Sequence, residues 1–203
     1  MKNIGIFGGS FNPFHLGHLQ ALKAFIGKYD FEKVLVIPTG IPPHKELTNN
    51  VNDCDRLEMV RLSVKDINNI EISDYEIKKQ GRSYTAETLE YLKSCYPDSH
   101  FILYTGSDMF LTLEKWHMPE KIFSLAEIAA FSRKGNDFKE LEKQKKFLED
   151  KYNAKCTIFK DIPLVISSTD IQEMIKNRND PSTYLSKNVF EYIKGKNLYQ
   201  NQD

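Results

Sequence analysis

The stretch from Gly8 to His18, GGSFNPFHLGH, most constrains what this chain can fold into. It follows the apolar run Ile4 to Phe7, which predicts a strand, and precedes Leu19 to Phe25, which predicts a helix. Its two glycines and its proline indicate a strand-to-helix turn. Backbone N–H groups at a helix N-terminus favour an anion. Because His15 and His18 close the turn, we expect it to hold a polyphosphate while charge on that group rearranges.

Strand and helix patterns alternate along the rest of the chain. They predict strands at residues 31–38, 70–73, 75–77, 100–104, 128–131 and 157–159. They predict helices at residues 16–28, 53–64, 85–96, 110–113, 119–125, 138–151 and 189–193, and one that begins near residue 166. Asp53 and Thr85 are expected to be N-caps. The alternation predicts a Rossmann-like α/β fold with a doubly wound, mostly parallel sheet. We expect one domain over residues 1–203, with a small helical C-terminal subdomain at about residues 165–199.

Clusters of polar residues follow several of the predicted strands. They cover residues 8–18, 39–45, 105–108 and 132–134. Ligands of open parallel sheets bind beyond the carboxyl ends of the strands, at the point where the strand order reverses. We therefore expect these clusters to meet at one edge of the sheet.

The charge balance limits the classes of partner. The chain has 28 Lys and Arg and 28 Asp and Glu residues, so a dedicated nucleic-acid-binding protein is not expected. No apolar run approaches the roughly 18 residues that a membrane span needs, and Met1 leads into a strand rather than a secretory signal. Cys54, Cys95 and Cys156 are far apart, which predicts free thiols in a reducing cytoplasm and no zinc site.

The opening turn resembles the H-x-G-H signature of the nucleotidylyltransferase superfamily. Further stretches narrow the resemblance to the bacterial nicotinate-mononucleotide adenylyltransferases. They are Ile37-Pro38 through Pro42-Pro43-His44-Lys45, Arg56 with Met59, Ser83-Tyr84-Thr85, Thr88-Leu89, Gly106-x-Asp108, Trp116, Ser132-Arg133 and Ile166-Ser167-Ser168-Thr169. The resemblance runs from Lys2 to about Tyr199. It implies transfer of AMP from ATP to nicotinate mononucleotide, which gives nicotinate adenine dinucleotide and pyrophosphate in NAD synthesis.

The resemblance also implies which residues form the site. His15 and His18 would be catalytic. The ATP site would comprise Gly8, Gly9, Ser10, Phe11, His15, His18, Gly106, Asp108, Ser167, Ser168 and Thr169. The nicotinate mononucleotide site would comprise Asn12, His44, Lys45, Tyr84, Thr85, Trp116 and Arg133. Mg²⁺ is expected to enter with ATP on phosphate oxygens and water, so no protein metal ligand is assigned.

Several of these assignments have a simpler structural alternative. A single tryptophan is more often a core residue, although stacking on a pyridinium ring is worth roughly 0.5–2 kcal/mol. Asp108 and the Ser167–Thr169 segment could do no more than cap helices. His44, Lys45 and Arg133 could be solvated surface residues.

One position departs from the family pattern. The family usually has arginine at the place of Gln172, and glutamine lacks the charge and bidentate fork of arginine. Lys176 follows one helical turn later and could substitute in part. Two alternative functions are a pantetheine-phosphate adenylyltransferase and a non-catalytic nucleotide-binding module on the same fold. The sequence leaves open whether copies associate as a homo-oligomer.

Overall fold

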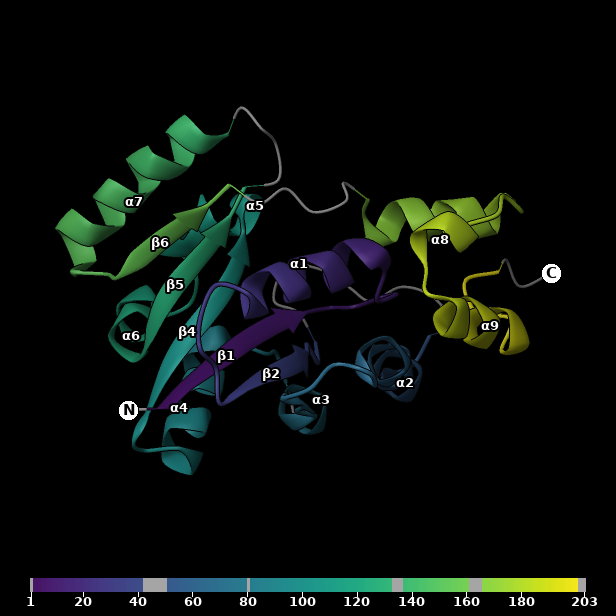
Figure 1. Ribbon diagram of the computed structural model, residues 1–203, viewed down its shortest axis with the longest axis horizontal. Helices are drawn as coiled ribbons and strands as arrows, with labels where there is room; N and C mark the ends of the chain where they lie inside the picture. Colours follow the sequence, from purple (N-terminus) through teal and green to yellow (C-terminus); the bar gives the residue numbers. More distant parts are fainter. Residues whose placement is uncertain (1, 42–50, 80, 133–136, 161–165, 201–203) are drawn as a thin grey trace.

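A six-stranded sheet forms the centre of the protein in the computed structural model (Figure 1). The structure describes residues 2–41, 51–79, 81–132, 137–160 and 166–200. The strands are β1 (Lys2–Gly9), β2 (Lys33–Pro38), β3 (Ile70–Ile72), β4 (Ser99–Gly106), β5 (Ala126–Phe131) and β6 (Cys156–Phe159). Their order is β3-β2-β1-β4-β5-β6, and each of these neighbouring pairs is parallel. The predicted α/β fold is therefore confirmed.

Alternate residues of the strands contribute their side chains to two apolar clusters, one on each face of the sheet. Ile4 and Ile6 of β1 belong to one cluster, and Phe7 belongs to the other. The first cluster packs against α4 (Thr85–Cys95), α6 (Pro119–Leu125) and α7 (Phe138–Tyr152). The second packs against α1 (Leu16–Ile26) and α2 (Asp53–Val64). Because both faces are covered, the strands read as almost continuous apolar runs.

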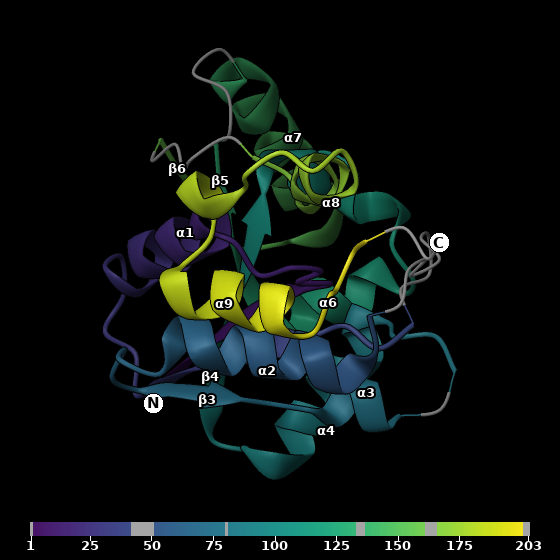
Figure 2. The same ribbon diagram turned by 90° about the vertical axis from the view of Figure 1, so that its right-hand side faces the viewer.

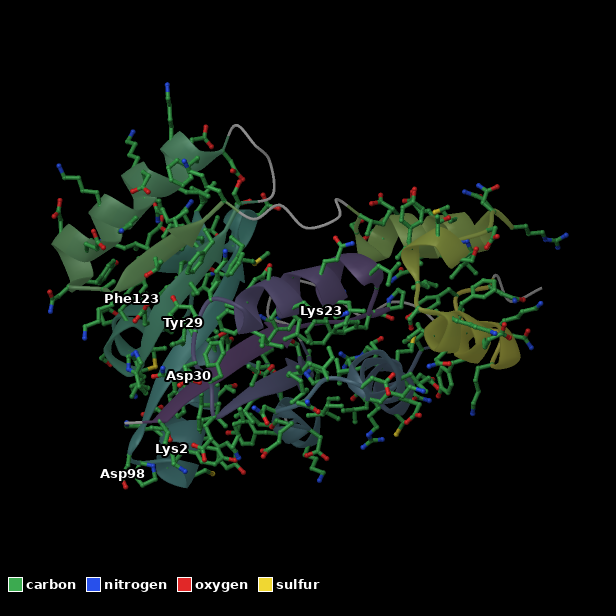
Figure 3. All side chains as sticks on the ribbon, in the orientation of Figure 1. Lys2, Lys23, Tyr29, Asp30, Asp98 and Phe123 are labelled. Atoms are coloured by element: carbon green, nitrogen blue, oxygen red, sulfur yellow. The ribbon has the colours of Figure 1, made fainter. Side chains whose placement is uncertain are left out.

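Helix α7 is the most highly charged helix of the fold. Only Leu141 and Leu148 are buried on it. Figure 3 shows charged side chains along its outer side, away from the sheet. The narrow apolar stripe thus attaches the helix to the sheet, and the rest of its surface is solvated.

The C-terminal helices share a third apolar cluster with α2. They are α8 (Ser168–Lys176), the short turn η2 (Ser182–Tyr184) and α9 (Lys187–Gly195). Figure 2 shows α9 lying along α2. Met59 of α2 is in the cluster, together with Ile171, Val189 and Tyr199. The apolar packing of the helical segment onto the body of the fold therefore involves α2.

Four local predictions differ from the structure. Residues 110–113 were expected to be a helix, but α5 (Ser107–Phe110) ends at Phe110 and the short 3-10 turn η1 (Leu113–Lys115) begins at Leu113. Residues 75–77 were expected to be a strand but lie in the short helix α3 (Tyr75–Lys78), so that prediction is wrong. The N-cap of α2 is Asn52 rather than Asp53, because its side chain accepts the N–H of Asp55. Thr85 is the first residue of α4 and Tyr84 is its N-cap. No helix in the described part of the chain is long and apolar enough to cross a bilayer.

Candidate active site

A cavity of about 1050 Å³ lies at the point where the strand order reverses. Strands β1 and β4 are neighbours there, and both contribute their carboxyl-terminal residues. Drug-sized ligands occupy pockets of about 300–1,000 Å³, so this cavity has room for two joined nucleotides. The predicted site residues that line it are Gly8, Gly9, Ser10, Phe11, His15, His18, Tyr84, Thr85, Gly106, Trp116 and Ser167.

His15 and His18 hold one another at the start of α1. The Nδ1 atom of His15 accepts the backbone N–H of His18, and the Nδ1 atom of His18 accepts the backbone N–H of His15, both at 3.3 Å. The two rings stack with their centroids 3.6 Å apart. This reciprocal arrangement is a capping box built from two imidazoles.

The capping box determines which nitrogen of each neutral ring carries its proton. A ring nitrogen that accepts a hydrogen bond has a free lone pair, so the proton of each neutral imidazole lies on Nε2. His15 is buried and His18 is half-buried, and both line the cavity. The turn can therefore offer two Nε2–H donors to one anion.

Aromatic side chains fix the position of the His18 ring. Phe11 meets it edge-on at 5.1 Å between centroids, and Phe14 lies 5.2 Å away. A side chain at Gly9 would place its Cβ 2.6 Å from the Phe11 ring. Glycine is thus required at this position for Phe11 to fold back toward His18.

The start of α8 also borders the cavity. Ser167 is its N-cap, and both Ser167 and Asp170 line the cavity. Asp170 accepts the hydroxyl of Ser167 at 2.7 Å and its N–H at 2.9 Å, and these two bonds lower the pKa of Asp170. The predicted capping role of this segment is present. Ser168 and Thr169, by contrast, do not line the cavity.

A second helix start, that of α4, also borders the cavity. Tyr84 and Thr85 line it, and no side chain caps the N-terminus of α4 among the described residues. Its first-turn N–H groups therefore suit a carboxylate. Trp116 is half-buried, packs against the core and also lines the cavity. The ring of His117 packs against that of Tyr84 with centroids 4.3 Å apart and planes tilted by 38°.

Several predicted residues lie elsewhere. Asp108 is exposed and does not line the cavity, although its neighbour Gly106 does. Asn12 is buried beside the cavity, where its backbone carbonyl accepts the Nε2–H of Gln172 at 2.5 Å. Gln172 thus contacts the opening turn. His44, Lys45 and Arg133 lie outside the described residues, so their roles stay predictions.

Sequence reasoning missed Glu76. It is buried, lines the cavity, and accepts the hydroxyl of Thr88 at 2.7 Å. A Cβ at Gly40 would lie 2.1 Å from the carbonyl oxygen of Glu76, so the two backbones are in direct contact. Residues 75–77 were predicted as a strand, because a helix of four residues is too short to leave a recognisable helical pattern. The burial of Glu76 in the cavity wall was therefore not predicted. Tyr104 and Thr105, at the end of β4, also line the cavity.

We predict that Glu76→Gln raises Tm at pH 7. Burial raises the pKa of Glu76. The folded state binds the proton of Glu76 more tightly than the unfolded state does. This contribution to the free energy of unfolding is fully present below the pKa of Glu76 in the unfolded chain, and it is lost as pH rises through the higher pKa in the folded protein. The glutamine amide of the variant is neutral at every pH, so the difference in Tm between the variant and wild type should vanish near pH 4. Each kcal/mol corresponds to about 2–4 °C in a chain of this size.

Thermal unfolding between pH 4 and 8 measures this effect. The matched control is Glu142→Gln, which removes an exposed carboxylate of α7. A Tm gain for Glu76→Gln that is equal at pH 4 and pH 7 would contradict the burial argument.

The sequence matches the cytidylyltransferase-like family over residues 6–174. A probable nicotinate-nucleotide adenylyltransferase of Clostridium botulinum (strain Alaska E43 / Type E3) is 41% identical over 202 residues and covers 100% of both chains. A probable nicotinate-nucleotide adenylyltransferase of Clostridium tetani is 36% identical, covering 98% of this chain and 100% of that protein.

Solved structures show the same fold. The nicotinic acid mononucleotide adenylyltransferase of Plasmodium falciparum complexed with NaAD matches with a TM-score of 0.80 at 22% identity. The same enzyme complexed with APC matches with a TM-score of 0.77 at 21% identity. Each match covers 98% of both chains.

Proposed function

The chain belongs to the cytidylyltransferase-like family, and within it to the nicotinate-nucleotide adenylyltransferases, and we propose that it transfers AMP from ATP to nicotinate mononucleotide. One observation carries the proposal. A single cavity joins the two imidazole donors of the opening turn to the uncapped start of α4 and to Trp116. Donors suited to phosphate oxygens and to the carboxylate of an aromatic acid therefore border the same cavity.

The reaction needs no covalent enzyme intermediate. A phosphate oxygen of nicotinate mononucleotide attacks the α-phosphorus of ATP in line. The new P–O bond forms as the bond to the β-phosphate oxygen breaks, and pyrophosphate leaves with the electron pair. His15 and His18 donate from Nε2 to phosphate oxygens whose charge grows in the transition state. The rest of the cavity holds the two nucleotides in line.

Mg²⁺ bound to the ATP phosphates would neutralise part of their charge. Among the described residues, no three His, Cys, Asp or Glu side chains are placed to hold a metal ion. Phosphate oxygens and water are the ligands that Mg²⁺ prefers, and they are expected to hold it here. A cytoplasmic location is part of the proposal, since ATP and pyridine nucleotides are available there.

Preference for the acid over the amide follows from the donors at α4. The N–H groups of its first turn and the Thr85 hydroxyl pair with a carboxylate. The NH₂ group of a carboxamide would face these donors without an acceptor, which costs affinity. We expect nicotinate mononucleotide to be preferred over its amide.

Pyrophosphate release from purified protein tests the proposed function. ATP and Mg²⁺ are supplied with nicotinate mononucleotide, nicotinamide mononucleotide or phosphopantetheine in separate reactions. Fastest turnover with nicotinate mononucleotide supports the proposal. Preferred turnover with phosphopantetheine would identify the other adenylyltransferase, and no turnover with any acceptor would indicate a binding module.

We predict that Trp116→Ala raises KM for nicotinate mononucleotide about tenfold. The loss of a stacking contact of roughly 0.5–2 kcal/mol underlies the estimate. KM for ATP should change by less than about twofold, because the opening turn, which is proposed to hold the ATP phosphates, follows β1, whereas Trp116 comes after β4. Trp116→Phe is the control, because it retains a ring and should recover part of the affinity. Equal changes in both KM values would assign Trp116 a packing role alone.

A further inference from the structure

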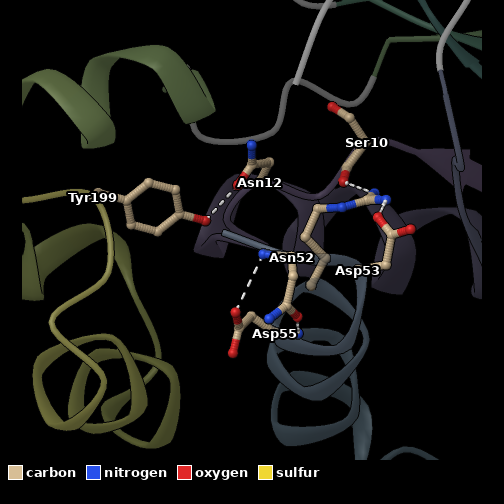
Figure 4. Close-up of polar contacts among 7 residues, drawn as sticks. Ser10, Asn12, Asn52, Asp53, Asp55 and Tyr199 are labelled. Atoms are coloured by element: carbon tan, nitrogen blue, oxygen red, sulfur yellow. Dashed lines mark hydrogen bonds and ion pairs between the residues drawn. The ribbon is translucent and has the colours of Figure 1, made fainter. Parts of the chain in front are cut away.

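The C-terminal helical segment donates three hydrogen bonds to two consecutive residues of the opening turn. Ser168 Oγ donates to the carbonyl of Pro13 at 3.0 Å, and Gln172 Nε2 donates to the carbonyl of Asn12. Tyr199 Oη donates to Oδ1 of Asn12 at 2.6 Å, the contact drawn in Figure 4. The donors lie 155 to 187 residues away along the chain. Three independent side chains therefore converge on one short segment.

The position of this segment affects the histidines directly. Pro13 is followed by Phe14 and then by His15, whose ring caps α1 and holds the backbone of His18. A shift of Asn12 and Pro13 would move the N-cap and, with it, both Nε2 atoms. Reacting groups must be held to within a fraction of an ångström, since a misplacement of about 1 Å can cost roughly 100-fold in rate.

Tyr199 has an unusual conformation for a bulky residue. Its φ is 63°, in the left-handed region, where a large side chain strains the backbone. Its side chain is fully buried in the cluster that contains Met59 and Ile171. The burial raises the pKa of Tyr199 well above its ordinary value, so the hydroxyl keeps its proton. The backbone strain is sustained by ring packing and by the hydrogen bond to Asn12.

We propose that Tyr199 is a positioning residue for the catalytic histidines. Its hydroxyl, together with Ser168 and Gln172, fixes Asn12 and Pro13 and so determines where His15 and His18 present their donors. Part of the active site is therefore assembled from the other end of the chain. The expected change in kcat rests on the proposed function. The expected change in the position of the two histidine rings rests on the structure alone.

Tyr199→Phe tests the proposal because it removes only the hydroxyl. The matched control is Tyr192→Phe, which removes the hydroxyl that donates to Asp55 at 2.9 Å between α9 and α2. Both variants weaken the attachment of the same helical segment. We expect Tyr199→Phe to lower kcat about tenfold, with both KM values within about twofold of wild type. Tyr192→Phe should lower Tm by a similar amount and leave kcat within about twofold of wild type.

A second measurement does not depend on turnover. The ¹H–¹⁵N resonances of the His15 and His18 rings should shift in Tyr199→Phe and stay in place in Tyr192→Phe. If the wild-type protein has no activity, the proposed function fails, while shifted ring resonances still support the positioning role. Unmoved resonances, an unchanged kcat in an active Tyr199→Phe, or an equal loss in both variants would overturn it.

Discussion

His18→Ala is expected to lower kcat by on the order of 100-fold, the usual effect of removing one preorganised donor to developing charge. The loss should appear mainly in kcat, because this donor acts most strongly as charge grows on the phosphate oxygens. Steady-state pyrophosphate release, with ATP and nicotinate mononucleotide varied in turn, measures it. A kcat close to that of wild type would exclude His18 from the chemical step.

His18→Asn separates the donor role of this residue from its capping role. The Asn oxygen can take the place of Nδ1 and accept the N–H of His15, but the short amide cannot reach the position of Nε2. We expect Tm near that of wild type and kcat as low as that of His18→Ala. His100→Ala is the control for histidine loss, because His100 lies at the start of β4, at the opposite end of the sheet. Its kcat should be unchanged.

Arg56→Met is expected to lower the free energy of unfolding by about 2–3 kcal/mol, the value of a hydrogen bond from a charged group at a buried site. Arg56 is fully buried in α2. Its Nη1 donates to the carbonyl of Ser10 at 2.8 Å, and its Nη2 pairs with Asp53 at 2.6 Å (Figure 4). Methionine fills much of the space but leaves the Ser10 carbonyl without this donor. KM for ATP should rise as well, since Ser10 lines the cavity.

The same helix supplies the control for this prediction. Arg61→Met removes an exposed guanidinium whose contact with Glu58 spans 3.5 Å. Exposed pairs of this kind contribute about 0–1 kcal/mol, so Tm should barely change. Urea unfolding of the two variants measures the difference. An equal loss in the free energy of unfolding in both variants would mean that burial does not strengthen the contribution of Arg56 to stability.

Much of the fold could be predicted because its signals are local. Buried parallel strands leave apolar runs such as HFILY at residues 100–104, and each long helix leaves a regular apolar stripe. The strands predicted at residues 31–38 and 128–131 correspond to β2 and β5. Short elements were less predictable. Four residues such as 75–78 fit a strand or one helical turn equally well, and packing decides between them.

Some residues of the candidate site could likewise be predicted from local sequence, and others could not. The turn with His15 and His18, and the order of the motifs that follow it, could be identified because each lies within one short segment. Glu76 could not be identified. A glutamate in a polar stretch gives no signal of burial, and only its contacts with Thr88 and Gly40 place it in the cavity wall.

The sequence by itself determined the alternation of strands and helices, the strand-to-helix turn that carries His15 and His18, and the family. Those features depend on periodicity and on residues a few positions apart. Only the tertiary structure decided how the turn is held. Arg56 reaches Ser10 across 46 residues and Tyr199 reaches Asn12 across 187. Contacts over such separations form only when the sheet and the C-terminal helices are packed together, so no local pattern could reveal them.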